Sequence, residues 1–417
     1  MPSPGRAPRP TAPRPEVDLA RWSLMAQFAL FGVLGTSWMS RLPSIRSELG
    51  LSAGQLGSLL VVGGAGTLLA VLVTGAVVAR FGSRRTLAAA TAGNVAGFGV
   101  LALATATGSI PLFAVGACVN GMCGALTNIP INISAAGVER AVGRAILPHF
   151  HAAFSVGAAL GALVGAGFAW SGAHVAVQLV VVTAAVTLVR ALLVVPATML
   201  APAHGRPATL GADARRGSGA RAALAAWREP RTLLIGLVLL AASLSEGSAG
   251  TWLALAVVDG FAAREAVGAV AYGTFVASMT VVRFAGTGLI DRYGRVAVLR
   301  VSGLSALAGL LLFGLAPALV LAWVGVVLWG CGAALANPIA ISAASDEPLH
   351  AAPRVSVATS FSTMSMLAAP PLLGLLADEV GVRSALLVIC GAVVLSLAVA
   401  GQVRRPQDAP VASTARW

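Results

Sequence analysis

The sequence of 417 residues contains no lysine, and only 10% of its residues carry a charge. A soluble domain carries about 25% charged residues, so this chain has too few to cover a surface in water. Instead, 57% of the residues are hydrophobic and the mean hydropathy is +0.87. The composition excludes an ordinary soluble domain and predicts an integral membrane protein.

Cysteines are also few. Cys118, Cys123, Cys331 and Cys390 all lie in apolar runs, without the spacing of metal ligands or of a disulfide framework. We interpret them as small packing residues. The sequence has no phosphate-binding loop, zinc motif or nucleophile triad. We therefore expect no cofactor, no metal and no enzyme activity.

Twelve apolar runs have the length of about 20 residues that a membrane-spanning helix needs. One long polar stretch, residues 201–230, divides them into two sets of six. We predict an all-α membrane protein with an N-terminal six-helix bundle at 21–200, a linker at 201–230 and a C-terminal six-helix bundle at 231–402. Residues 1–20, rich in Pro and Arg, are predicted to be a disordered tail, and residues 403–417 a second tail.

The arginines indicate the orientation, because cytoplasmic loops are enriched in positive residues. With the N-terminus in the cytoplasm, only four of the 28 arginines fall on outside loops and two lie within helices. The prediction is a multi-pass protein of the plasma (inner) membrane with both termini in the cytoplasm. The net charge of +13 then reflects membrane insertion and contact with anionic lipid heads, which argues against nucleic acid as a partner.

One buried stretch occurs twice. "CGALTNIPINISAA" at 123–136 returns as "CGAALANPIAISAA" at 331–344, with 9 of 14 residues identical. The offset of 208 residues is almost half of the chain, so both halves are predicted to be copies of one six-helix unit. Pro130 and Pro338 occupy the same place in the two copies. Because proline loosens a membrane helix without breaking the fold, we predict helix kinks at both.

Two loops half a chain apart also carry similar residues. "GAVVARFGSRR" at 75–85 follows the second run, and "LIDRYGRVAVLR" at 289–300 follows the eighth. Both resemble the loop signature of the major facilitator superfamily: Gly, three residues, Asp, Arg, any residue, Gly, any residue and two basic residues. Each copy is partial, since Ala79 replaces the Asp of the first and Thr287 the first Gly of the second.

The resemblance implies two pseudo-symmetric bundles around a substrate path, and a cytoplasmic latch in these loops that holds the outward-open state. Acids 208 residues apart, Glu139 and Glu347, could meet Arg80 and Arg292. Arg283 could share a helix face with Asp291 and position the loop. The alternative is a solvated charged loop. The residues assigned to the latch are Arg80, Gly82, Arg84, Arg85, Glu139, Arg283, Asp291, Arg292, Gly294 and Glu347.

The resemblance extends to one branch of the superfamily. "SWMSRLPSIR" in the first half and "EGSAGTWLALAVVDG" in the second are similar to the branch that holds the inner-membrane protein YbjJ and the rhizopine transporter MosC. The chain departs from this branch where its members carry acids, since Asn128 and Ser134 occupy those places. Thr251 stands where an Asp is frequent beside the following Trp252.

Glu246 is the one acidic residue of 15 that does not fall in a tail, a loop or a helix end. It lies roughly 22 Å into the seventh run at 1.5 Å per residue, near the middle of the membrane. A carboxyl at that depth is costly unless it is protonated, paired or facing water. We predict that Glu246 binds and releases the coupling proton. The alternative is a neutral acid that only packs.

Polar and aromatic residues of the central helices are assigned to the substrate path, because the resemblance implies that helices 1, 4, 7 and 10 line the centre. Arg41 could pair with Glu246 or reach the outer surface, and His151 could face the path or form a polar helix end. Amides, an indole and one carboxyl suit a small polyhydroxylated or amino-bearing solute. The assigned residues are Trp38, Arg41, Asn128, Asn132, His151, Trp252 and Asn337.

The predicted function is secondary active transport, coupled to protons, of a sugar-, polyol- or amino-sugar-like solute across the inner membrane by alternating access. We expect a monomer whose other partners are protons and membrane lipids. One alternative is proton-driven efflux of a drug-like or biosynthetic metabolite. Another is a transporter-like membrane receptor, which the short linker disfavours.

Overall fold

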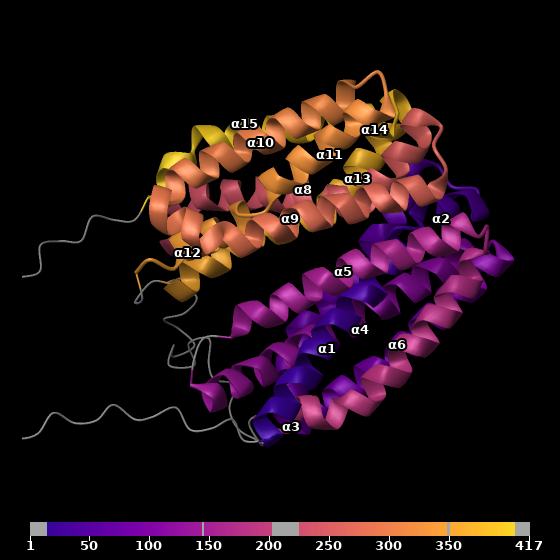
Figure 1. Ribbon diagram of the computed structural model, residues 1–417, viewed down its shortest axis with the longest axis vertical. Helices are drawn as coiled ribbons and strands as arrows, with labels where there is room; N and C mark the ends of the chain where they lie inside the picture. The colour runs from indigo at the N-terminus through magenta and orange to yellow at the C-terminus, as the bar shows by residue number, and fades with distance from the viewer. Residues whose placement is uncertain (1–14, 144–145, 202–224, 348–350, 405–417) are drawn as a thin grey trace, which may run out of the picture.

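The computed structural model describes residues 15–143, 146–201, 225–347 and 351–404, and the elements found there are helices and their connecting turns. The N half runs from α1 to α6 and the C half from α8 to η1 (Figure 1). The N half consists of α1 (Pro15–Met39), α2 (Leu42–Glu48), α3 (Ala53–Thr107), α4 (Ile110–Val142), α5 (Leu147–Trp170) and α6 (Val175–Thr198). The C half consists of α8 (Pro230–Phe261), α9 (Glu265–Tyr293), α10 (Arg295–Leu315), α11 (Leu319–Ala333), α12 (Ala336–Ala344), α13 (Ala351–Val380), α14 (Val382–Ala385), α15 (Val388–Ala398) and η1 (Ala400–Val403).

The described helices supply twelve spans, as predicted. Ten segments are long and apolar enough to cross a membrane, and α3 among them holds two spans, one on each side of Gly82. Residues 382–398 add a shorter apolar segment. Gly82 has φ 79° and ψ 161°, so the chain turns there although the helix is otherwise continuous. The linker and the two tails lie largely outside the described residues, and α1 already begins at Pro15.

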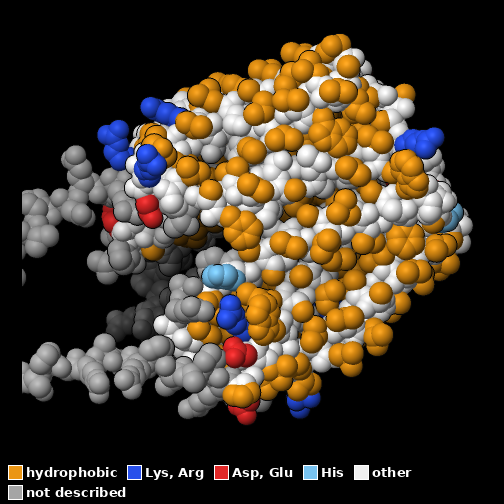
Figure 2. All heavy atoms as spheres, viewed as in Figure 1, with side chains coloured by type: hydrophobic (Ala, Val, Ile, Leu, Met, Phe, Trp, Pro, Cys, Tyr) orange, Lys and Arg blue, Asp and Glu red, His pale blue; other side chains and the backbone are white. Residues whose placement is uncertain are grey.

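The two ends of the bundle differ. α1 begins, α6 ends, α8 begins and η1 ends on one side, at the left in Figure 1, which we call the tail side. The side that carries α2 and α14 is called the far side. Hydrophobic side chains cover the flanks of both halves, and charged side chains gather toward the two ends (Figure 2). Lipid solvates such apolar flanks, whereas water does not.

Packing between the halves is concentrated on the far side. One buried core joins Leu42 and Ile45 of α2 to Leu253 and Val257 of α8. Toward the tail side the N half has a core of its own, formed by α1, α3, α4, α5 and α6 around Phe150. In Figure 1 the helices of the two halves accordingly converge on the right and diverge on the left.

Candidate functional site

Glu246 of α8 and Arg283 of α9 form an ion pair inside the C half. Nη2 of Arg283 lies 3.1 Å from Oε1 and 3.0 Å from Oε2 of Glu246. Nδ2 of Asn337 in α12 donates a third hydrogen bond to Oε2, at 3.0 Å. Both charged side chains are 32% exposed, and Glu246 lies half-way along the 32 residues of α8. The carboxylate is thus paired, yet open to a small solute or a proton.

Pro338 contributes to this site through the backbone. Proline has no N–H, so it leaves the carbonyl oxygen four residues earlier without its helical partner. That oxygen belongs to Ala334, in the break between α11 and α12. Nε of Arg283 donates to it at 3.2 Å. The proline of the duplicated stretch therefore creates an acceptor that holds the guanidinium. Pro130 differs, because α4 continues through it.

Arg283 and Arg41 lie elsewhere than the sequence suggested. Arg283 was expected to position the loop at Asp291, but its side chain contacts Glu246, because α8 and α12 are its neighbours in space. The sequence left two alternatives for Arg41: a pair with Glu246, or a position at the outer surface. It is 3% exposed and pairs with Glu265 of α9, with 3.0 Å between Nε and Oε2.

A cavity of about 290 Å³ lies between the two halves. Trp38, which the sequence analysis assigned to the substrate path, lines it. Trp252 does not line it and is buried in the core at 1% exposure. The polar residues of its wall come from both halves and are Thr67, Asn94, Asn120, Ser243, Thr251 and Ser365.

All other residues assigned to the path lie outside this cavity too, including Arg41 and Asn337. Asn128 and Asn132 bond to each other along α4, with 3.0 Å between Nδ2 of Asn132 and Oδ1 of Asn128. Asn128 lies one turn beyond Gly124 of the cavity wall, on the same helix face and nearer the tail side. His151 is exposed and packs edge-on against Phe28, with 5.6 Å between ring centroids.

A buried arginine supports the cavity wall of the N half. Arg190 of α6 is 0% exposed. Its three guanidinium nitrogens donate to Oε1 of Gln27 at 3.2 Å, Oδ1 of Asn94 at 3.1 Å and Oγ1 of Thr127 at 3.0 Å. Nδ2 of Asn94 then donates to Oδ1 of Asn120 at 3.2 Å. All of these partners are neutral, so the positive charge is solvated by oriented dipoles.

This series of hydrogen bonds from Arg190 fixes the orientation of the amide groups of Asn94 and Asn120. A guanidinium has only donors, so Asn94 must present its oxygen to Arg190 and its NH₂ to Asn120. Asn120 in turn accepts through its oxygen. Its Nδ2 finds no acceptor among the described residues. Asn94 is not among the residues that the sequence analysis assigned to the path; the signal for its importance is Arg190, an arginine in an otherwise apolar run.

Arg41 also belongs to the contacts that join the halves on the far side. Besides its pair with Glu265, it donates to Oε1 of Gln178 at 3.0 Å and to the carbonyl oxygen of Ala173 at 2.9 Å. The backbone N–H of Ser44 donates to Glu265 at 3.0 Å, and its hydroxyl donates to the same carboxylate. Glu265 of the C half is thus held by two residues of the N half.

Two further clusters join the halves, and both lie on the far side. Arg46 pairs with Asp259, and Asp378 accepts hydrogen bonds from the start of α3. Nearby, burial raises the pKa of the Glu48 carboxyl, opposed by the N–H of Val175. These contacts close the far side in this structure.

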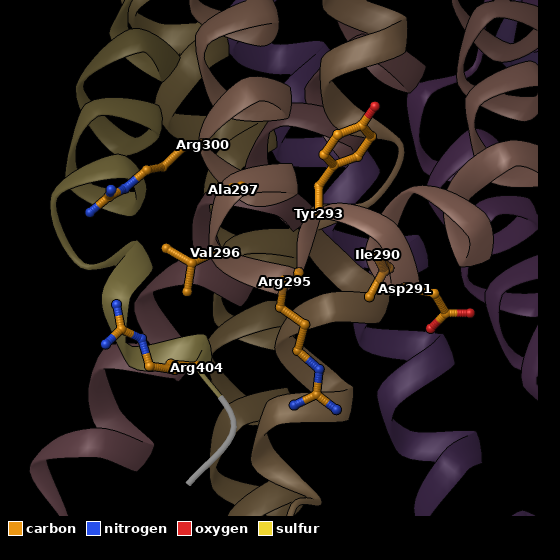
Figure 3. A pocket seen from close by; sticks show the side chains of 9 residues that line it. Ile290, Asp291, Tyr293, Arg295, Val296, Ala297, Arg300 and Arg404 are labelled. Carbon is orange, nitrogen blue, oxygen red and sulfur yellow. The ribbon is translucent and has the colours of Figure 1, made fainter. Parts of the chain in front are cut away.

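Apart from Arg283, the predicted latch residues lie on the tail side. The side chains of Arg80, Arg84 and Arg85 are exposed, and Asp291 has no ion pair among the described residues. In Figure 3 the Asp291 carboxylate points away from Arg404 and Arg300.

The acids expected to meet the loop arginines have other partners. Glu139 accepts from the N–H groups of Ile146 and Leu147, at 2.8 and 2.7 Å, where α5 begins. Glu347 pairs with Arg354 at 3.0 Å.

Within the described part of the chain, Arg295 is the loop arginine that meets an acid. It lies 2.6 Å from Asp346 at the end of α12, and Arg231 contacts the same carboxylate at 2.8 Å. The sequence prediction did not include this cluster.

Known proteins resemble the chain along most of its length. The family model described as Major Facilitator Superfamily matches residues 23–361. The uncharacterized transporter y4wD of Sinorhizobium fredii is 31% identical over 368 residues, which cover 88% of this chain and 93% of that protein. The membrane protein MosC of Rhizobium meliloti is 26% identical over 373 residues, or 87% and 85% of the two chains.

The fold is shared with solved transporters. The crystal structure of the nucleoside transporter NupG superimposes with a TM-score of 0.70 at 18% identity, over 93% of this chain and 99% of that one. The predicted fold class and the resemblance to MosC are therefore confirmed, and the relatives are transporters and not enzymes. The chain belongs to the Major Facilitator Superfamily.

Proposed function

We propose that the chain is a proton-coupled secondary active transporter that carries a small polar solute through the central cavity by alternating access. The pairing of Glu246 with Arg283 is the observation that carries this proposal. The tail side is then cytoplasmic, in agreement with the arginines gathered in its loops, and the membrane is the inner membrane. With the far side closed, the solute exchanges with the cytoplasm in this state.

The proton step follows from the chemistry of the pair. Ionised Glu246 neutralises Arg283 in a part of the membrane where an unpaired charge is costly. A proton that binds the carboxylate removes its charge and weakens the hold on Arg283, which keeps its bond to the carbonyl oxygen of Ala334. Partial exposure of both groups gives the proton a route. Binding and loss of the proton thus change the contacts between α8, α9 and α12.

A chain of hydrogen bonds links the cavity to Glu246. Ser243 in the cavity wall donates to Oδ1 of Asn337 at 3.4 Å, and Nδ2 of Asn337 donates to Glu246 at 3.0 Å. A solute that takes a hydrogen bond from Ser243 would withdraw that donor from Asn337. Solute binding and protonation would then change each other's free energy, which is the requirement for coupling.

The cavity wall suits a solute with several polar groups. The N half contributes Asn120, whose buried NH₂ group has no acceptor among the described residues, and the C half contributes Ser243, Thr251 and Ser365, of which the Ser365 hydroxyl is also buried without a described partner. Trp38 adds a flat apolar surface. Carbonyl or hydroxyl oxygens of a sugar-, polyol- or amino-sugar-like molecule would satisfy the Asn120 donor, and its hydroxyls would bond across to the C half.

The test uses purified protein in liposomes that contain a pH-sensitive dye. A panel of radiolabelled sugars, polyols and amino sugars is added outside, with and without an inward proton gradient. We expect at least one solute to accumulate with the gradient and to carry protons inward when it is supplied alone. Accumulation without any movement of protons, or no accumulation of any member of the panel, would contradict the proposal.

A further inference from the structure

Three turns between helices share one unusual backbone conformation. Gly82 has φ 79° and ψ 161°, Gly294 has 78° and 158°, and Gly381 has 82° and 150°. This region is essentially restricted to glycine. The first two glycines belong to the loop signatures of the tail side. Gly381 joins α13 to α14 on the far side.

The sequence around Gly381 follows the same signature. "GLLADEVGVR", Gly374 to Arg383, has a Gly, three residues, Asp378, two residues, a second Gly and an Arg two positions later. It has Asp378 where the first tail-side copy has Ala79, and Gly374 where the second tail-side copy has Thr287. Glu379 stands where the signature has an arginine.

Asp378 in this third copy bridges to the other half. Its Oδ1 accepts from the N–H of Ala53 at 2.8 Å, and its Oδ2 accepts from the N–H of Gly54 at 3.0 Å and from Oγ of Ser52 at 2.9 Å. These residues begin α3, where the first N–H groups have no helical partner and carry partial positive charge. Charge-assisted bonds of this kind are stronger than neutral ones.

The first glycine of the copy brings the two backbones into contact. A Cβ atom on Gly374 would lie 2.5 Å from the carbonyl oxygen of Ala53 and 3.0 Å from Cα of Gly54. One turn deeper, a Cβ atom on Gly57 of α3 would lie 2.2 Å from the carbonyl oxygen of Pro370 in α13. Small residues thus allow α13 to approach α3 closely enough for Asp378 to reach the start of α3.

We propose that Gly374–Arg383 is a far-side latch, which holds the two halves together when the far side is closed and releases them when it opens. In the same structure Asp291, the corresponding aspartate of the tail-side copy, is exposed and has no ion pair among the described residues. One signature is engaged while its counterpart on the opposite side is not. The inference rests on alternating access in the proposed function but does not depend on proton coupling or on the solute.

Distances between spin labels on the far side test the latch without substrate. Labels are attached to cysteines introduced as Thr107→Cys in the N half and Ala318→Cys in the C half, both at exposed positions, in a chain whose four native cysteines are replaced. Asp378→Asn removes the charge and one acceptor oxygen. We expect the population with the longer, open distance to rise about tenfold, as for the loss of one charge-assisted bond. Glu379→Gln removes the neighbouring charge, which makes no bond to α3, and should leave the distribution unchanged.

Unchanged distances in Asp378→Asn, or an equal change in Glu379→Gln, would overturn the inference. If Asp378→Asn does not fold, Ser52→Ala removes a single donor from the opposite half, and it should shift the distances in the same direction by a smaller amount. No shift in Ser52→Ala would then count against the latch. Because the experiment uses neither solute nor pH gradient, failure of proton coupling would not alter its outcome.

Discussion

The carbonyl oxygen of Ala334 is left without a helical partner by Pro338 and accepts a hydrogen bond from Arg283 at 3.2 Å. The same guanidinium holds both oxygens of Glu246. The break between α11 and α12, the guanidinium of Arg283 and the carboxylate of Glu246, which is the proposed proton carrier, are therefore in direct contact. Helix geometry and protonation can influence each other through Arg283.

Pro338→Ala tests this relationship. Alanine restores an N–H that can bond to the carbonyl oxygen of Ala334, so Nε of Arg283 has to share its acceptor and α11 can continue into α12. We expect slower gradient-driven uptake. Solute affinity should change little, because neither Pro338 nor Arg283 lines the cavity. Pro130→Ala in the continuous α4 is the matched control and should slow uptake less. An equal effect of both variants would mean that the two prolines only bend their helices.

Asn337→Leu should separate the cavity from the proton site. Leucine shares the branching of asparagine at Cγ but bonds to neither Ser243 nor Glu246. We expect solute exchange to continue while fewer protons move with each solute molecule. The measurement is the ratio of proton flux to solute flux in liposomes. Asn132→Leu is the control, because it changes an amide outside this chain of bonds, and its ratio should be that of the wild type. A wild-type ratio in Asn337→Leu would show that Asn337 does not belong to the coupling route.

Asn120→Leu should weaken solute binding about tenfold, the effect of one lost hydrogen bond of about 1.4 kcal/mol. Leucine removes the oriented donor of the cavity wall and leaves the acceptors of Arg190 in place. Equilibrium binding of the transported solute to purified protein measures this. Wild-type affinity would show that the solute does not contact Asn120.

Arg190→Met should destabilise the N half by about 3 kcal/mol, because three buried acceptors lose a charged donor at once. Arg190→Lys should be almost as unstable, since an ammonium group cannot reach acceptors arranged around a planar guanidinium. Thermal unfolding in detergent compares both with Arg300→Met, which changes an exposed arginine. Unfolding of all three at the wild-type temperature would contradict the structural role of Arg190.

Sequence reasoning reached the fold because membrane spans are long and apolar, and because the duplicated stretch reveals the two halves. It singled out Glu246 because a lone carboxyl in a span stands out. It placed Arg283 with Asp291 because only separation along the helix was visible, whereas its contacts lie on α8 and beside α12.

Contacts across the halves were harder to predict. The partners of Asp378 and Glu265 lie more than 200 residues away in the chain, and no periodicity connects them. The third signature was readable from its glycine and aspartate spacing, but only the backbone angle of Gly381 and its contact with α3 distinguish it from an ordinary turn.

Glu246→Gln tests the central claim most directly. Glutamine keeps the size of the side chain and one acceptor for Asn337 and Arg283, but it cannot ionise. In liposomes that contain the transported solute, two activities are measured on the same preparation: accumulation driven by a proton gradient, and exchange of labelled for unlabelled solute without a gradient. We predict that accumulation is lost while exchange persists, because exchange requires no net movement of protons. Accumulation at the wild-type rate in Glu246→Gln would contradict proton coupling through this residue.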